Sequence, residues 1–456
     1  MEKNLTIGRP VVVILTFAIP LFLGNLLQQS YNILDTFIVG RTIGLNALAA
    51  VGSTGSLNFL ILGFINGFGI GAAVITSQRF GSQDIEGVRK SFIATIFISI
   101  GLSIILTIIS VLCAKPLLIF LQTPAEILDN AYIYIVIIFL GIPTAMLFNF
   151  FANVMRAVGD SRTPLYFLAI AFALKFVLNL FFIMVLNTGV GGVALSTVIA
   201  QLFSGLLCLL FILKKMPILR ITLKDWKINP EEISKHLKIA LPVGFQMSII
   251  AIGSITVTYA LNLLGTESIA AYSAAAKIDI LAYMVLFSFG GAMTTYSAQN
   301  YGAHKIDRIK KGIFHISIIA CIYSIVIALV FVFSGYFFPS LFLGWESPQT
   351  LAMARTYLII CSSSYIFLAM LFIIRQSLLG MGDSITPTIA GIMELVMRIF
   401  AAIILGNIFG FTGICFANPL AWVGAIIPLT IAFFIRMKKL KKEALKEEAC
   451  NNISDK

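Results

Sequence analysis

The sequence predicts an all-α integral membrane protein of twelve transmembrane helices, built as two six-helix repeats. Three observations predict it: the composition, the recurrence of long apolar runs, and four sequence pairings at a nearly constant offset. The chain has 456 residues, of which 59% are hydrophobic and only 11% are charged. A soluble globular chain carries about 25% charged residues, so this composition indicates a membrane protein.

Apolar runs recur along almost the whole chain, and each is at least as long as the roughly 20 residues that an α-helix needs to cross a bilayer. The runs are continuous rather than alternating in hydrophobicity, which excludes the strands of a membrane β-barrel. The expected spans are 11–39, 46–77, 90–114, 128–152, 164–186, 190–213, 237–264, 268–298, 312–337, 351–374, 385–407 and 410–435.

The distribution of basic residues predicts the topology. An even number of spans places both chain ends on the same side of the membrane. Almost all of the 32 lysine and arginine residues fall in loops on that side or inside spans, and only Arg41, Lys115 and Arg355 fall in loops on the other. The positive-inside rule then places both termini in the cytoplasm of a multi-pass cell-membrane protein. The net charge of +12 is therefore a topology signal, and we expect no nucleic-acid partner.

The two halves of the chain resemble each other in four places, in the same order and at an offset of 221 to 223 residues. Each half therefore holds about six spans in the same orientation, which is a plan of secondary transporters. Such a repeat can enclose a pathway within one chain, so we expect a monomer. The pairings are "NALAAVGS" (46–53) with "ESIAAYSA" (267–274), "SQRFG" (77–81) with "AQNYG" (298–302), "GDSRTP" (159–164) with "GDSITP" (382–387), and "TGVGGVALS" (188–196) with "FGFTGICFA" (409–417).

The repeat predicts the domain organisation. We expect an N-lobe of six spans over 1–213 and a C-lobe of six spans over 237–436. A basic, polar cytoplasmic loop over 214–236 joins the lobes, and a charged cytoplasmic tail covers 437–456. The glycine-rich segment 62–74 is interpreted as a small-residue face for helix packing rather than as a ligand cradle.

Ionisable residues at membrane depth mark functional sites, each with a partner to be identified. Glu394 and Arg398 are four residues apart and share one helix face as a pair. Lys277 and Asp279 either neutralise one another or lie near the outer end of their span. Six residues fall well inside the predicted spans, namely Asp35, Asp279, Glu394, Lys175, Lys277 and Arg398.

Asp35, in "QQSYNILDTFIVG" (28–40), has no opposite charge within one helical turn. Its neighbours on the same helix are polar: Gln28 two turns before it, and Tyr31 and Asn32 one turn before it. A lone acid on a polar stripe suits a group that binds and releases a proton. Lys175 is the unpaired base of the same half, so we hypothesise an ion pair that protonation of Asp35 releases.

Motifs for other chemistry are absent from the sequence. It contains no P-loop, dinucleotide fingerprint, HExxH or CxxC. We therefore expect neither an enzyme nor a bound cofactor or structural metal. Without a nucleotide-binding domain, transport is driven by an ion gradient or is passive.

Seven motifs follow one another along residues 10 to 436: "IPLFLGNLLQQSYNILDTFIVG", "ALAAVGSTG", "RAVGDSRTP", "LPVGFQMSI", "AQNYGA", "LLGMGDSITP" and "FANPLAW". In these motifs the chain resembles the multidrug and toxic compound extrusion (MATE) family. The resemblance implies two six-helix lobes in a V and alternating access. It also implies export of small organic compounds, such as drugs and toxic metabolites, in exchange for inward H⁺ or Na⁺.

The resemblance also implies roles for single residues. Asp35 matches the family's first-helix acid, which takes the coupling ion. In the fifth span the usual "LNxxLD" reads "LKFVLN", so that Lys175 replaces an asparagine and Asn179 an aspartate. The lysine makes an oxygen-rich sodium site harder to build, so H⁺ is favoured over Na⁺ at Asp35. The expected cavity residues are Gln28, Asn32, Asn153, Lys175, Asn179, Thr197, Glu394 and Arg398.

Two functions compete. The first is an ion-coupled exporter of small organic compounds. The alternative is a flippase for a lipid-linked or oligosaccharide cargo, which should line its path with basic residues for pyrophosphate. Lys175 and Arg398 are candidates, although Glu394 offsets them. A receptor or scaffold without transport is disfavoured by the repeat.

Overall fold

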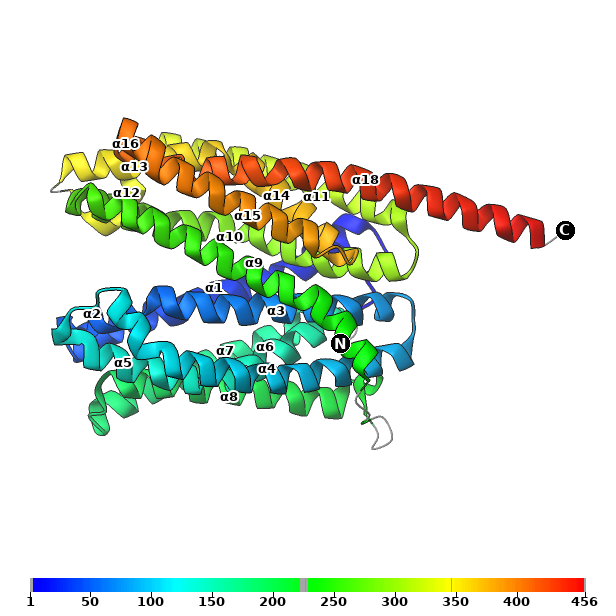
Figure 1. The fold of residues 1–456 in the computed structure, drawn as a ribbon, viewed down its shortest axis with the longest axis horizontal. Coiled ribbons are helices and arrows are strands. Elements are labelled where there is room, and N and C mark those ends of the chain that lie inside the picture. Colours follow the sequence, from blue (N-terminus) through cyan, green and yellow to red (C-terminus); the bar gives the residue numbers. More distant parts are fainter. Residues whose placement is uncertain (1–2, 222–225, 227–228, 346, 455–456) are drawn as a thin grey trace. The chain divides into compact units, whose positions relative to one another are not determined.

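The computed structural model describes residues 3–221, 226, 229–345 and 347–454, and of residues 32 and 444–454 it describes the backbone alone. Throughout this part of the chain the regular structure is helical, and no strand is present (Figure 1). Among the described residues, ten helices are long and apolar enough to cross a membrane, and the number rises to twelve when each of two bent helix pairs counts as one span. The predicted all-α membrane fold is confirmed.

The first half of the chain contains eight α-helices and one π-helical turn. They are α1 (Pro10–Thr42), α2 (Leu45–Ser53), α3 (Gly55–Gly81), α4 (Ile85–Phe120), α5 (Ala125–Leu140), α6 (Ile142–Ala157), α7 (Arg162–Leu180), η1 (Phe181–Val185) and α8 (Gly189–Lys215).

The second half follows a short 3₁₀ turn, η2 (Pro217–Leu219). Its elements are α9 (Pro230–Leu263), α10 (Thr266–Gly302), α11 (Ile306–Phe333), α12 (Phe337–Leu343), α13 (Pro348–Ser363), α14 (Tyr365–Gly380), α15 (Ile385–Phe400), the π-helical turn η3 (Ala401–Leu405), α16 (Gly406–Phe409), α17 (Phe411–Cys415) and α18 (Ala417–Ser454).

Two of the predicted continuous spans are bent. The pair α5–α6 bends by 45° and the pair α13–α14 by 48°. Pro143, in the first turn of α6, has no N–H to continue the helical hydrogen bonds of α5. Before α14, the hydroxyl of Ser363 donates to the carbonyl of Ile360 at 2.8 Å, a local bond that competes with the helix. Neither bend can be predicted from hydropathy alone.

The chain forms two compact units. Unit 1 consists of Met1–Asn4 and Thr16–Ala251, and unit 2 consists of Leu5–Leu15 and Ile252–Lys456. Helices α1 and α9 are therefore each divided between the units. The linker expected over 214–236 falls partly on residues outside the described ranges, and the lobe boundaries taken from the sequence stay a prediction.

In unit 1 the glycine-rich face of α3 packs directly against the first half of α9. A Cβ atom on Gly67 would lie 2.6 Å from the carbonyl oxygen of Val243, and one on Gly71 would lie 2.8 Å from the Cα of Ala240. Only glycine permits this approach of two helix backbones. The packing interpretation of segment 62–74 is confirmed.

The repeated hexapeptide forms the same turn in both units. Gly159 and Gly382 adopt positive φ angles of 90° and 87°. The next residue caps the following helix: an Asp160 oxygen accepts from the amide of Thr163 at 3.0 Å, and an Asp383 oxygen accepts from that of Thr386 at 3.0 Å. These turns start α7 and α15, the helices that carry the buried bases.

Candidate functional site

The carboxylate of Asp35, on α1, is 5% exposed, and both of its oxygens are bound by side chains of α7. The Lys175 ammonium lies 2.7 Å from Oδ2, and the Asn179 amide donates to Oδ1 at 3.1 Å. The ion pair hypothesised from the sequence is present, with Asn179 as a second ligand of the carboxylate.

The helices α7 and α8 together orient these groups. Lys175 and Asn179 are one helical turn apart, so both side chains leave the same face of α7. The hydroxyl of Ser196, on α8, donates to the side-chain oxygen of Asn179, which leaves the amide N–H free to face Asp35. Ser196 is not among the residues expected from the sequence, although it is adjacent to the expected residue Thr197.

The aromatic side chain of Tyr31 also packs against the ion pair. The Lys175 ammonium lies 4.7 Å from the ring centroid of Tyr31, a cation–π contact. The Tyr31 ring stacks on Phe172 at 5.3 Å, and its hydroxyl donates to the carbonyl of Leu168 at 3.1 Å. Lys175, which is 1% exposed, is thus held between a carboxylate and an aromatic face.

A pair with this burial is stable only while both partners are charged. Removing one charge from a buried ion pair leaves the other uncompensated in a medium of low dielectric constant, which costs about 3–5 kcal/mol. A proton delivered to Asp35 removes the counter-charge of Lys175. The contact between α1 and α7 therefore depends directly on the protonation state of Asp35.

Of the other expected residues of unit 1 whose side chains are described, none is bonded to Asp35 or Lys175. Gln28 is partly buried on α1, and the side chain of Asn32 lies outside the described part of the chain. Asn153, buried on α6, accepts from the guanidinium of Arg156 at 3.2 Å. Thr197 is partly buried and donates to the carbonyl of Val193 in its own helix at 3.1 Å.

In unit 2, Glu394 and Arg398 on α15 form the expected pair, with 3.7 Å between a guanidinium nitrogen and a carboxylate oxygen. A second base, Arg375 on α14, binds the other oxygen of Glu394 and is 3% exposed. The expected span 351–374 ended just before Arg375 and so placed it in a cytoplasmic loop, which is wrong, because α14 continues to Gly380. The repeat carried the missing signal: an offset of 223 aligns Arg375 with Ala152, inside an expected span.

Asp279, on α10, is buried without a basic partner among the described residues. It accepts hydrogen bonds from the hydroxyls of Tyr357, at 3.3 Å, and Tyr365. The Lys277 side chain is exposed and its ammonium lies 5.7 Å from the ring centroid of Phe342. Mutual neutralisation of Lys277 and Asp279 is therefore wrong, because the two side chains leave opposite faces of α10.

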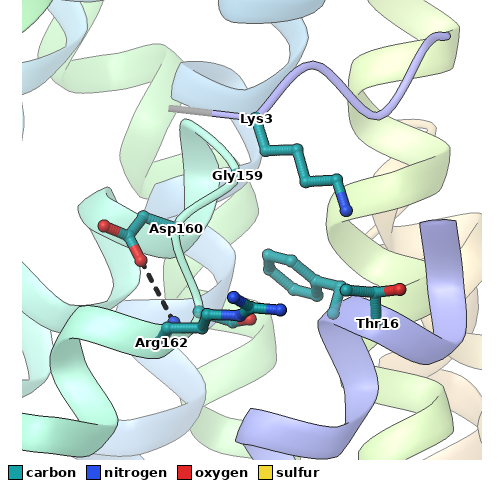
Figure 2. Close-up of a pocket in the computed structure, with 7 residues that line it drawn as sticks. Lys3, Thr16, Gly159, Asp160 and Arg162 are labelled. Carbon is teal, nitrogen blue, oxygen red and sulfur yellow. Dashed lines mark hydrogen bonds between the residues drawn. The ribbon is translucent and has the colours of Figure 1, made fainter. Parts of the chain in front are cut away.

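A cavity of about 350 Å³ lies beside the turn between α6 and α7 (Figure 2). It is lined by Lys3, Thr16, Phe17 and residues 159–162, and the Arg162 amide donates to Asp160 at 3.1 Å within its wall. No residue expected for the cavity of a transporter is among these lining residues. The cavity is thus separate from the buried ion pair.

A family model described as MatE matches residues 20–181 and 242–404. This chain belongs to the MatE family. The matched ranges contain Asp35, Lys175 and Asn179 in one segment and Glu394 and Arg398 in the other. The family consists of transporters, so the chain is a multi-span membrane transporter and not an enzyme, as the sequence predicted.

Relatives and solved structures agree with this membership. The "Probable multidrug resistance protein YpnP" of Bacillus subtilis is 30% identical over 308 residues, which cover 67% of this chain and 68% of the relative. The "Multidrug export protein MepA" of Staphylococcus aureus is 22% identical over 92% of this chain and 93% of its own. A crystal structure of MATE in complex with MaL6 has a TM-score of 0.89 at 22% identity, covering 97% of this chain and all of that one.

Proposed function

We propose that this chain is a proton-coupled antiporter that exports small organic compounds by alternating access, with Asp35 as the coupling acid. The observation that carries the proposal is the buried contact of 2.7 Å between Asp35 and Lys175. Proton binding to Asp35 breaks the electrostatic part of this contact and changes how α1 is held by α7. Deprotonation restores it, so one proton distinguishes two states of the helix pair.

The names of the relatives support the class of substrate. The proteins of Bacillus subtilis and Staphylococcus aureus are named for multidrug resistance and multidrug export. We also expect this chain to act in the cell membrane with both termini in the cytoplasm, and as a monomer, because its two repeats can enclose a pathway within one chain. The basic loops of the sequence support that orientation.

The ligands of Asp35 support H⁺ rather than Na⁺. A hard cation needs several oxygen ligands around it. Here one carboxylate oxygen is bound by the Lys175 ammonium and the other by the Asn179 amide, so nitrogen donors occupy the positions that a sodium ion would take. A proton needs only one lone pair of Asp35 and no rearrangement of further oxygens.

Apart from Asp160 in a turn and Glu232 in the first turn of α9, the buried acids and bases of the described residues are equal in number, which argues against selection for strongly cationic compounds. Arg375 takes the place of the exposed Lys277 in this set. The acids are Asp35, Asp279 and Glu394, and the bases are Lys175, Arg375 and Arg398. Each of these bases also contacts a carboxylate, which supports an exporter over a flippase that would need bases for a pyrophosphate.

Transport by purified protein in liposomes tests the proposal. Uptake of a panel of fluorescent organic dyes would be measured at fixed membrane potential, with a proton gradient or a sodium gradient imposed separately. We expect the proton gradient alone to drive uptake, and Asp35→Asn to abolish that component. Asp129→Asn, which removes an exposed acid at the start of α5, serves as the matched control. Proton-driven uptake that persists in Asp35→Asn would rule out coupling at this residue.

A further inference from the structure

The repeated motif at the ends of α3 and α10 has no role in the coupling site. It reads "SQRFG" over Ser77–Gly81 and "AQNYG" over Ala298–Gly302. In each unit, this motif contacts a segment at, or just before, the first helix of the other sequence repeat. In unit 1 that segment is the first turn of α9, and in unit 2 it is Leu5, which precedes the start of α1 at Pro10.

In unit 1 the contact is ionic. The guanidinium of Arg79 lies 2.6 and 2.7 Å from the two carboxylate oxygens of Glu232, in the first turn of α9. The same guanidinium donates to the carbonyl of Gly87 at 2.8 Å, which joins the beginnings of α4 and α9 to the end of α3. Both distances are from one guanidinium nitrogen, Nη2, which donates a charge-assisted hydrogen bond to Oε1. Such a bond is about twice as strong as one between neutral groups.

A buried hydrogen-bond chain continues the contact one turn further along α9. His236 bonds to the hydroxyl of Ser91 at 2.7 Å through one ring nitrogen, and to the carbonyl of Glu232 at 2.8 Å through the other. Ser91 also bonds to Thr76 of α3 at 2.7 Å. Together with the glycine face of α3, these bonds hold the first half of α9 rigidly within unit 1.

In unit 2 the same motif holds backbone instead of a side chain. The oxygen of Gln299 accepts from the amide of Leu5 at 2.8 Å, and the amide of Asn300 donates to the carbonyl of Leu5 at 3.3 Å. The Lys305 ammonium donates to the carbonyl of Thr6 at 3.1 Å. Asn300 is the repeat counterpart of Arg79, at an offset of 221 residues.

Both clasped helices then reach a buried base in the other unit. α1 begins in unit 2 and carries Asp35, which binds Lys175 in unit 1. α9 begins in unit 1, and its Gly253 lies against Arg398 in unit 2, where a Cβ atom would be 3.1 Å from the arginine Cδ. Lys175 and Arg398 are themselves repeat counterparts. Each long helix is thus fixed at its start by one unit and rests on the buried base of the other.

We propose that the two copies of this motif are reciprocal clasps, formed by Arg79 on Glu232 and by Gln299 and Asn300 on Leu5, that position α1 and α9 for the transport cycle. A change in the contact between one of these helices and its buried base alters the position of the helix, and the clasp links that change to the unit in which the helix begins. For α1 this rests on the proposed coupling at Asp35; for α9 it does not. The clasp residues are positioning residues and contact no substrate.

Hydrogen–deuterium exchange of the full-length protein, without substrate or gradient, tests whether the ionic clasp holds α9. Glu232→Gln removes the charged partner of Arg79. A hydrogen bond between charged groups is strong enough that its loss should speed amide exchange over residues 230–240 about tenfold. Glu231→Gln is the matched control, since its side chain is 74% exposed on the same turn. Unchanged exchange over these residues in Glu232→Gln would overturn the clasp.

Transport then tests the positioning role. We expect Glu232→Gln to lower dye efflux several-fold while dye binding and the thermal midpoint stay near those of the wild type. The swapped pair Arg79→Glu with Glu232→Arg should restore both efflux and slow exchange. Gln299→Leu should lower efflux in the same way through α1. Faster exchange with wild-type efflux would show a purely structural anchor and overturn the proposal.

Failure of the clasp proposal can be distinguished from failure of the proposed coupling at Asp35. Exchange over residues 230–240 reports the clasp of α9 and does not depend on Asp35. If Asp35→Asn transports normally while Glu232→Gln still loses efflux and protection, coupling at Asp35 fails and the clasp of α9 stands.

Discussion

The two units place a base at equivalent positions, Lys175 and Arg398, but surround it differently. Lys175 meets one acid, Asp35, in a one-to-one pair. Arg398 shares a single acid, Glu394, with Arg375, so two bases surround one carboxylate. The one-to-one pair suits the proposed switch, because loss of one charge would leave its partner unpaired. In the second arrangement, one carboxylate is shared by guanidinium groups of α14 and α15, and this contact braces the two helices.

The isolated acid of unit 2 sharpens this contrast. Asp279 is held by two tyrosine hydroxyls, and Tyr357 in turn accepts from the Asn418 amide at 3.1 Å. Hydroxyl donors stabilise a carboxylate without neutralising it. The same fold therefore presents a buried acid in three environments: with one base, with two bases and with none.

The largest expected effect is loss of the brace. Glu394→Gln keeps the shape of the side chain but leaves Arg375 and Arg398 without a counter-charge. Breaking a buried ion pair from one side costs about 3–5 kcal/mol, so we expect a large drop in the thermal midpoint of the purified protein. Glu267→Gln, at an exposed acid in the first turn of α10, is the control. A midpoint equal to that of the wild type would contradict the brace.

Breaking the ion pair of unit 1 should destabilise the protein somewhat less, and a second substitution in the pair should reverse the loss of stability. Lys175→Met leaves Asp35 unpaired, and we expect a loss of about 3 kcal/mol, the lower end for one-sided removal. Because Asp35 can take up a proton, the loss should shrink in acidic buffer. Adding Asp35→Asn should recover stability without recovering proton-driven transport. Thermal midpoints of the four variants of this cycle check the coupling, and strictly additive effects would exclude it.

The tyrosine-held acid should show an intermediate effect. Tyr365→Phe removes one donor to the buried carboxylate of Asp279, a loss of about 1–3 kcal/mol. We expect a lower thermal midpoint but an unchanged response of transport to the proton gradient. Tyr166→Phe, at a side chain that is 61% exposed, should leave both unchanged. Loss of proton-driven transport in Tyr365→Phe would instead assign Asp279 a part in coupling.

The smallest effects should come from the feature that the units share. Asp160→Ala and Asp383→Ala remove equivalent helix caps, and each loss of a cap costs about 1 kcal/mol. We expect the two thermal midpoints to fall by similar amounts, because the turns are alike. Clearly unequal shifts would indicate that the surroundings of the two turns differ in effect, for example through the cavity that Asp160 lines.

The sequence by itself determined the fold class, the approximate spans, the repeat and the position of an acid, Asp35, inside the first span. These follow from local properties: hydropathy over about 20 residues identifies a span, and the cost of burying a charge makes each intramembrane acid conspicuous. The sequence also predicted the pairing of Asp35 with Lys175, since they are the only two such charges expected in that half, and the structure confirms this contact.

Only the tertiary structure decided which side chains bind the other buried acids, Glu394 and Asp279. Arg375 joins Glu394, and Tyr365 joins Asp279, across different helices and at separations of 19 and 86 residues in sequence. The bends of α5–α6 and α13–α14, and the exchange of the first helices between the units, are equally invisible to hydropathy. The physical reason is that hydropathy reports whether a side chain is buried, whereas the packing of helices decides what it is buried against.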